Sequence, residues 1–166
     1  MMQARLINTQ LMIDSHTALV VGASRGIGLA ITQRLLQEQG IQRVYASYRH
    51  PDTAAGLLNI SDERLQTIEA DLTSQEDLQG LAAEIQANGD QPDFVINSAG
   101  ILHEHELQPE KSLNQCHQDS LTRMFQVNSI GPLMLASAII PLMPKDRPAH
   151  FAVLSAMVGS IGDNRL

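Results

Sequence analysis

The chain has 166 residues, 43% hydrophobic and 17% charged, and its 11 Lys and Arg against 18 Asp and Glu give a net charge of −7. This composition excludes a disordered chain and predicts one folded domain. The acidic balance without a basic run argues against nucleic acid and anionic membranes as partners, and we expect no apolar run near the roughly 20 residues of a membrane span.

The first residues of the chain and its single cysteine favour a cytoplasmic protein. Residues 1–16 lack the basic start and long apolar centre of a signal peptide, and we expect a short leader before one domain over 17–166. The single Cys116 excludes an intramolecular disulfide and favours a reducing, cytoplasmic setting. It lies in a polar stretch without a motif, so we expect it to be inert.

The first predicted elements meet at a glycine-rich turn. Residues 18–21 indicate a short buried strand, and a helix should follow. The apolar side predicted for that helix consists of Ile27, Ala30, Ile31 and Leu35. Gly22, Gly26 and Gly28 between strand and helix allow a tight turn and the close approach of a ligand, and the helix start suits a phosphate. Glycine clusters also occur in ordinary turns, so the order of the other elements must show whether this turn binds a nucleotide.

Strands and helices then alternate along the chain. Further strands are predicted at 43–48, 65–70, 94–96 and 150–155. Pro51 can open a short helix to Asn59, and a capping box at Thr73 and Glu76 begins another. A long helix is expected over roughly 113–142, disturbed near Gly131-Pro132 because proline removes a helical hydrogen bond.

This alternation predicts an α/β fold, a doubly wound parallel sheet with helices on both faces. Ligand sites in such sheets lie beyond the carboxyl ends of the strands. Polar or small residues follow all five predicted strands there: Gly22 to Arg25, Arg49, Asp71, Asn97 and Ser155. Their common position favours a nucleotide site more strongly than the glycines alone.

Four motifs make the sequence resemble the short-chain dehydrogenase/reductase family. VGASRGIG at 21–28 is similar to the family's TGxxxGxG, ADL at 70–72 matches its adenine-side position, and NSAG at 97–100 matches NNAG with Ser98 replacing the second Asn. VNSIGP at 127–132 matches a helical segment that supplies an Asn, and 153–164 is most similar to the C-factor and sniffer carbonyl reductases. The resemblance implies a Rossmann-type sheet of order 3-2-1-4-5, incomplete at its C-terminal side.

The residues after the second strand favour NADP(H) over NAD(H). An NAD site usually has an acid about 20 residues after the glycines, but Arg49 stands here and no acid lies in 46–50. Arg25 and Arg49 could pair with a 2′-phosphate, or could be solvated surface charges. The cofactor residues that motif and resemblance together imply are Gly22, Ser24, Arg25, Gly26, Ile27, Gly28, Arg49, Asp71, Leu72, Asn97, Ala99 and Gly100. Asn97 could equally be a hydrogen-bonding residue at the strand end.

The family's chemistry is carbonyl reduction by hydride transfer. A Tyr serves as general acid, a Lys lowers the pKa of that Tyr, a Ser polarises the carbonyl, and an Asn in the long helix holds a water in the proton path. The resemblance assigns Asn128 as the Asn and Ser155 as the candidate Ser. Ser160 is the second candidate for this Ser. The alternative for Ser155 is a serine at a strand end whose hydroxyl makes a hydrogen bond to the backbone. The only tyrosines are Tyr45 and Tyr48, and no Tyr-x-x-x-Lys occurs. We expect the chain to stop before that motif, and residues 1–166 alone to be inactive.

The implied partners are a small carbonyl or alcohol substrate and further copies of the chain, as a dimer or tetramer. The long helix should pack on the sheet and, by the resemblance, on a neighbouring subunit. The run from His103 to Glu106 alternates potential metal ligands, but without a second ligand cluster we expect a solvated loop and no metal. The alternative function is a non-catalytic dinucleotide-binding sensor or a C-factor-like signalling module.

Overall fold

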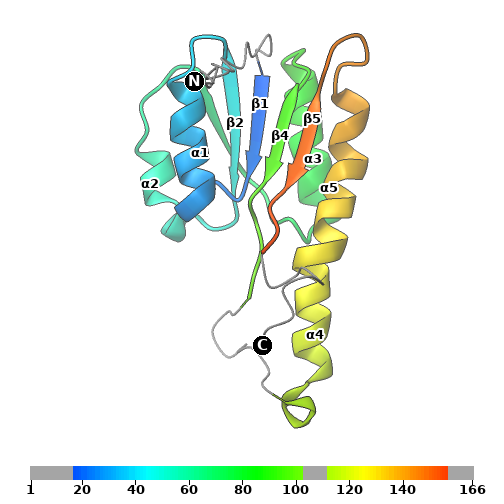
Figure 1. The fold of residues 1–166 in the computed structure, drawn as a ribbon. Coiled ribbons are helices and arrows are strands. Elements are labelled where there is room, and N and C mark those ends of the chain that lie inside the picture. The colour runs from blue at the N-terminus through cyan, green and yellow to red at the C-terminus, as the bar shows by residue number, and fades with distance from the viewer. Residues whose placement is uncertain (1–16, 103–111, 157–166) are drawn as a thin grey trace, which may run out of the picture.

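The computed structural model describes residues 17–102 and 112–156, which form a five-stranded parallel sheet in the order β3-β2-β1-β4-β5 (Figure 1). The strands are β1 (Thr17–Val21), β2 (Arg43–Tyr48), β3 (Leu65–Glu69), β4 (Phe94–Asn97) and β5 (His150–Val153). This confirms the predicted fold class and strand order. The leader proposed for residues 1–16 lies outside the described residues.

Helices cover both faces of the sheet, with α1 and α2 on one face and α3 and α5 on the other (Figure 1). Their bounds are α1 (Gly26–Leu36), α2 (Ala55–Leu58), α3 (Gln75–Ala87), α4 (Gln118–Phe125) and α5 (Gly131–Ile139). Short 3-10 turns are η1 (Pro51–Thr53), η2 (Leu113–Gln115) and η4 (Ile140–Leu142), and the π-turn η3 (Gln126–Ile130) joins α4 to α5. Helix α4 projects beyond the carboxyl ends of the strands.

Strand β1 lies between two hydrophobic cores. Ala18 and Val20 belong to the core under α1 and α2, whereas Leu19 and Val21 belong to the core under α3 and α5. Burial on both faces explains why the strand sequence TALVV lacks the alternation of a half-exposed strand. This central position fixes where β1 ends, and therefore where the glycine turn begins.

The predicted inner face of α1 is wrong in part. Its buried residues are Gly28, Thr32, Leu35 and Leu36, whereas Ile27 is 65% exposed. Thr32 can be buried because its Oγ1 donates a hydrogen bond to the Gly28 carbonyl, 2.9 Å away. A glycine and a satisfied threonine thus take positions that a search for apolar residues passes over, and the helix is rotated from the predicted face.

The start of α3 differs from the predicted capping box by one residue. Ser74 is the N-cap, its Oγ accepting from the Asp77 N–H at 3.2 Å and donating to Asp77 Oδ1 at 2.8 Å. Thr73 instead donates both its N–H and its hydroxyl to Asp71 Oδ1, at 2.7 Å each. The Ser-x-x-Asp pair satisfies the helix start as Thr-x-x-Glu would have done.

The predicted long helix begins later than expected, at Gln118, and continues to Leu142. Its predicted disturbance is confirmed as the π-turn before Gly131 and Pro132, since Pro132 has no N–H to donate to the carbonyl of Asn128 four residues earlier. The 25-residue run is long and apolar enough to cross a membrane by length and composition, contrary to expectation. A single such helix is weak evidence for a span. Leu135 and Ile139 are buried on the sheet, but only 22% of the most apolar window of the run is buried.

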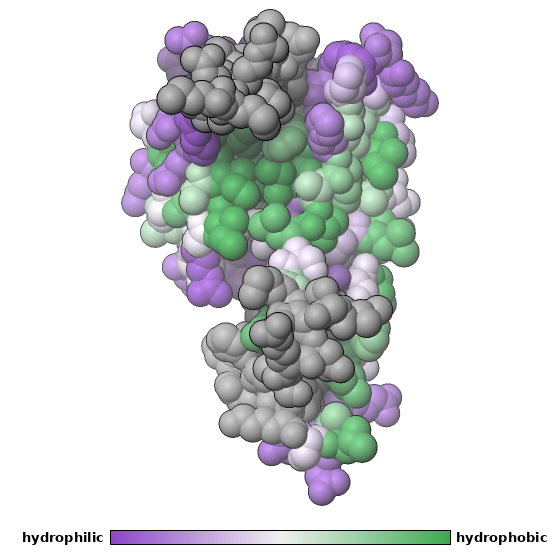
Figure 2. Space-filling view, viewed as in Figure 1, coloured by the Kyte–Doolittle hydropathy of each residue, from purple (hydrophilic) through white to green (hydrophobic). Residues whose placement is uncertain are grey.

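Hydrophobic side chains also lie away from the sheet on this run, which forms the right edge of the molecule in Figure 2. The exposed members are Leu121, Phe125, Ile130, Leu133 and Ile140. The helix therefore has apolar residues on the side that packs on the sheet and on sides that do not.

Candidate functional site

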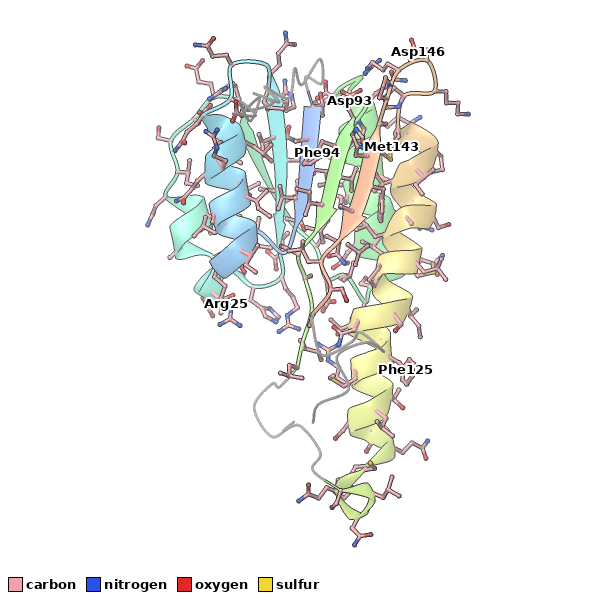
Figure 3. All side chains as sticks on the ribbon, viewed as in Figure 1. Arg25, Asp93, Phe94, Phe125, Met143 and Asp146 are labelled. Carbon is pink, nitrogen blue, oxygen red and sulfur yellow. The ribbon has the colours of Figure 1, made fainter. Side chains whose placement is uncertain are left out.

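A cleft of about 800 Å³ opens at the carboxyl ends of the strands. Its walls come from the β1–α1 turn, the residues after β2, the β3–α3 loop and the segment after β4. Arg25 lies at this end of the sheet and Asp93 at the opposite end (Figure 3). The volume falls within the range usual for small-molecule and cofactor sites.

Most of the predicted cofactor residues come together in this cleft. Those that line it are Gly22, Ser24, Arg25, Gly26, Ile27, Gly28, Arg49, Asp71, Leu72, Ala99 and Gly100. Asn97, Asn128 and Ser155 do not line it.

The glycine turn is packed too closely for side chains at two positions. Gly22 has a φ of +80°, and a Cβ there would lie 2.7 Å from the Ala99 nitrogen. A Cβ on Gly28 would lie 2.2 Å from the Gly22 oxygen and 2.4 Å from Ser98 Oγ. The turn therefore stays open to a ligand and tight against β4 only if both positions remain glycine.

The start of α1 has the properties of an anion site. Its N-cap, Arg25, makes no side-chain capping hydrogen bond, and the first turn contains no acid. The start of α3, in contrast, is capped by Ser74 and carries Glu76 and Asp77 in its first turn. Amide N–H groups at an uncapped helix start, at the positive end of the helix dipole, favour a phosphate. The residues around the cleft thus fit a phosphate-bearing dinucleotide.

Positive and negative side chains lie at the far end of the cleft from β4. Arg25 is exposed and Arg49 half-buried, and both line the cleft with Asp71. Burial acts to raise the pKa of Asp71, but hydrogen bonds from Thr73, with Arg49 and Arg123 nearby, hold that pKa below its usual value. Asp71 therefore remains an ionised hydrogen-bond acceptor at neutral pH.

Asn97 lies behind the cleft rather than in its wall. The residue is fully buried, and its Oδ1 accepts a hydrogen bond from the Ala99 N–H at 3.1 Å. Its Nδ2 has no hydrogen-bond partner in the structure as described. In this arrangement Asn97 shapes the turn that presents Ala99 and Gly100 to the cleft.

Asn128 holds the segment that follows β4. Its Oδ1 accepts from the Ile101 N–H at 2.9 Å, and its Nδ2 donates to the Ile101 carbonyl at 2.7 Å. Ile101 lines the cleft, as does Val127 beside Asn128. These two hydrogen bonds therefore connect the π-turn to the edge of the cleft at Ile101.

Ser155 lies two residues beyond the end of β5 and is exposed. Ser160 and the run from His103 to Glu106 lie outside the described residues. Within residues 17–102 and 112–156 no group of three potential metal ligands gathers.

Several cleft residues were not predicted, among them Tyr48, His50, Thr53, Ser98 and Val127. Tyr48 and His50 flank Arg49 at the end of β2, so the rule that placed Arg49 at the site applies equally to them. Ser98 lies inside the NSAG motif. Nothing local in the sequence identifies Val127 as a cleft residue. It lines the cleft because the π-turn to which it belongs borders the cleft.

Tyr45 is unsuited to proton donation near neutral pH. The residue is fully buried, and its hydroxyl donates to Asp90 Oδ2 at 2.6 Å and accepts from Asn88 Nδ2 at 3.0 Å. Burial and the bond to Asp90 raise its pKa from 10.0 to about 12. The side chain does not line the cleft.

This shift predicts a loss of stability in alkali. The fold requires the neutral phenol, so its contribution is complete below pH 10 and disappears as the pH rises towards about 12. We expect the urea midpoint of the wild-type protein to fall more steeply between pH 10 and about 12, the interval between the two pKa values, than that of Tyr45→Phe. Parallel profiles of the two proteins would contradict the assignment.

Comparison with known proteins gives a consistent result. The family model for short chain dehydrogenases matches residues 16–165. The 1-hydroxy-2-glutathionyl-2-methyl-3-butene dehydrogenase of Rhodococcus sp. (strain AD45) is 31% identical over 149 residues, covering 89% of this chain and 59% of that protein. The chain thus spans less than two thirds of that relative's length.

Two solved structures show the same fold. The NADPH-bound carbonyl reductase from chicken fatty liver is 25% identical, with a TM-score of 0.78 over 90% of this chain and 60% of that one. The carbonyl reductase Sniffer of D. melanogaster is 24% identical, with a TM-score of 0.79 over 91% of this chain and 65% of that one. The Rossmann-type fold implied by the sequence is confirmed.

Proposed function

The chain belongs to the short-chain dehydrogenase family, and on that premise we propose that its cleft binds NADP(H). The observation that carries the proposal is the uncapped start of α1, which opens onto the same cleft as Arg25 and Arg49. A phosphate group would bind at the uncapped start of α1. The two guanidinium groups would bind an additional phosphate on the ribose. The NADPH bound in the chicken carbonyl reductase supports this choice of cofactor.

The cleft residues divide into three groups along a dinucleotide. The turn from Gly22 to Gly28 would hold the pyrophosphate, and Arg25 and Arg49 the 2′-phosphate. Asp71 and Leu72 would contact the adenine, while Ala99 and Gly100 would border the ribose and nicotinamide. Asn97, buried behind Ala99, would act by fixing that border.

Titration of the protein with NADPH and NADH by calorimetry tests the proposal. We expect NADPH to bind more tightly, because only NADPH carries the phosphate that Arg25 and Arg49 would meet. Equal affinity for the two cofactors would contradict the assignment of the arginines, and binding of neither would contradict the proposed function.

We further propose that the protein is an NADP(H)-dependent oxidoreductase that interconverts a small carbonyl compound and its alcohol. The cofactor supplies the hydride. Both polar side-chain atoms of Asn128 are bound to Ile101, so we assign its proposed part in the proton path to its main-chain carbonyl, from which Pro132 removes the α-helical donor. Ser155 remains the proposed residue for polarising the carbonyl.

Residues 1–166 are expected to bind NADPH without reducing a carbonyl substrate. The sequence has no tyrosines besides Tyr45 and Tyr48, and the pKa of Tyr45 is raised to about 12. An assay of NADPH oxidation with small aldehydes and ketones should show no turnover above background. Turnover like that of an intact reductase would contradict this expectation.

The alternative, a dinucleotide-binding sensor or signalling module, predicts the same inactivity. The coding sequence after Leu166 distinguishes the two. A Tyr-x-x-x-Lys motif soon after that position would support the reductase, and a stop codon the sensor.

We propose a homodimer or tetramer that associates through the apolar side chains exposed on the long helical run. Phe125 is 63% and Leu133 69% exposed, and burying such side chains between copies would be favourable. We expect Phe125→Glu with Leu133→Glu to shift the protein to monomers in analytical ultracentrifugation. Leu58→Glu, at a residue 41% exposed on α2, is the control that should not. An unchanged mass of the double variant would contradict this interface.

The cytoplasmic location and the absence of nucleic-acid and membrane partners stay predictions from composition.

A further inference from the structure

Ser98 joins β4 to the glycine turn through its side chain. Its Oγ lies 2.8 Å from the Val21 carbonyl oxygen and 3.1 Å from the Gly22 carbonyl oxygen, so its one hydroxyl hydrogen is shared between these two acceptors. Its N–H donates to the Val21 carbonyl as well, at 2.9 Å. Ser98, directly after β4, thus contacts both the last carbonyl of β1, at Val21, and the first carbonyl of the turn, at Gly22.

The same hydroxyl lies against the start of α1. A Cβ on Gly28 would come within 2.4 Å of Ser98 Oγ, so the helix start, the turn and Ser98 are in close contact. Ser98 also lines the cleft, and Ala99 and Gly100 after it form the wall proposed for the ribose and nicotinamide. The residue therefore connects the two walls that the two halves of a dinucleotide would touch.

We propose that Ser98 is a positioning residue, which fixes the phosphate-binding turn relative to the wall formed by Ala99 and Gly100. This inference rests on the proposed function. Loss of its hydroxyl removes the donor that the Val21 and Gly22 carbonyls share and allows the turn to move. The effect falls on the pyrophosphate region, which NADPH and NADH share, and not on Arg25 and Arg49.

Calorimetric titration of Ser98→Ala with both cofactors tests the proposal. We expect the affinities for NADPH and for NADH to fall by a similar factor, about five- to tenfold, as for the loss of one buried hydrogen bond. The ratio of the two affinities should therefore stay at the wild-type value. Ser98→Thr keeps the hydroxyl and should restore most of the affinity for both.

Ser74→Ala is the matched control. It removes a serine hydroxyl that also makes hydrogen bonds at a helix start, but at α3 and outside the cleft. This variant should lower the thermal midpoint while leaving both affinities unchanged, which separates a loss of stability from a loss of positioning.

Three results would overturn the inference. Wild-type affinity in Ser98→Ala would show that the hydroxyl does not position the turn. A changed ratio of NADPH to NADH affinity would place its effect at the 2′-phosphate instead. An equal loss in Ser74→Ala would make it a consequence of general destabilisation. Binding of neither cofactor by the wild-type protein would overturn the proposed function itself.

Discussion

Replacing Gly28 by alanine is expected to abolish measurable binding of NADPH. The added Cβ would lie 2.2 Å from the Gly22 oxygen and 2.4 Å from Ser98 Oγ, far inside van der Waals contact. The Gly22 oxygen belongs to the backbone, so the overlap is relieved only if the start of α1 or the glycine turn moves. Losing two hydrogen bonds from the turn to a charged phosphate, each worth about 1.5–3 kcal/mol, would lower the affinity at least about a hundredfold.

Gly80→Ala is the matched control for this variant. Gly80 lies within α3, and a Cβ there would meet nothing within 4 Å. Alanine is the better helix former, so Gly80→Ala should be neutral or slightly stabilising and bind NADPH normally. Calorimetry and thermal unfolding of both variants check the prediction. Binding by Gly28→Ala within threefold of the wild type (about 0.7 kcal/mol) would show that the turn does not hold the cofactor.

Removing both arginines of the cleft is expected to abolish the preference for NADPH. Arg25 and Arg49 would each make a charge-assisted bond with the 2′-phosphate, and each such bond contributes about 1.5–3 kcal/mol. In Arg25→Ala/Arg49→Ala, the affinity for NADPH should fall at least about a hundredfold. The affinity for NADH, which lacks this phosphate, should change little.

Arg34→Ala is the control for the loss of charge. Arg34 is exposed on α1 and pairs with Glu38, and it does not line the cleft. Its replacement should leave both affinities within twofold, a small effect typical of surface ion pairs (about 0.4 kcal/mol). Equal losses for NADPH and NADH in the double variant would contradict a 2′-phosphate site, because they would indicate contacts with a part that both cofactors share.

The sheet could be predicted because its signals are local and repeated. Strand β1, TALVV, is buried on both faces, so its sequence has no polar alternation and predicts a buried strand. The strand order follows from parallel crossovers and the family resemblance. The inner face of α1 could not be predicted from the sequence, because it depends on tertiary contacts. Gly28 is buried by close packing on the turn, and Thr32 by a hydrogen bond within its own helix.

The same distinction applies to the site. Arg49 and Asp71 could be placed at the cleft because they follow strands whose carboxyl ends share one edge of the sheet. Asn97 matches a motif equally well but lies behind the wall, since a motif does not specify which way a side chain turns. Val127 reaches the cleft through the position of the π-turn, which is a property of the whole fold.

A crystal structure of the protein with NADPH tests the central claim most directly. We predict that the pyrophosphate lies against the backbone amides at the start of α1 and that the 2′-phosphate contacts Arg25 and Arg49. A dinucleotide bound away from this turn, or a 2′-phosphate that touches neither arginine, would contradict the account.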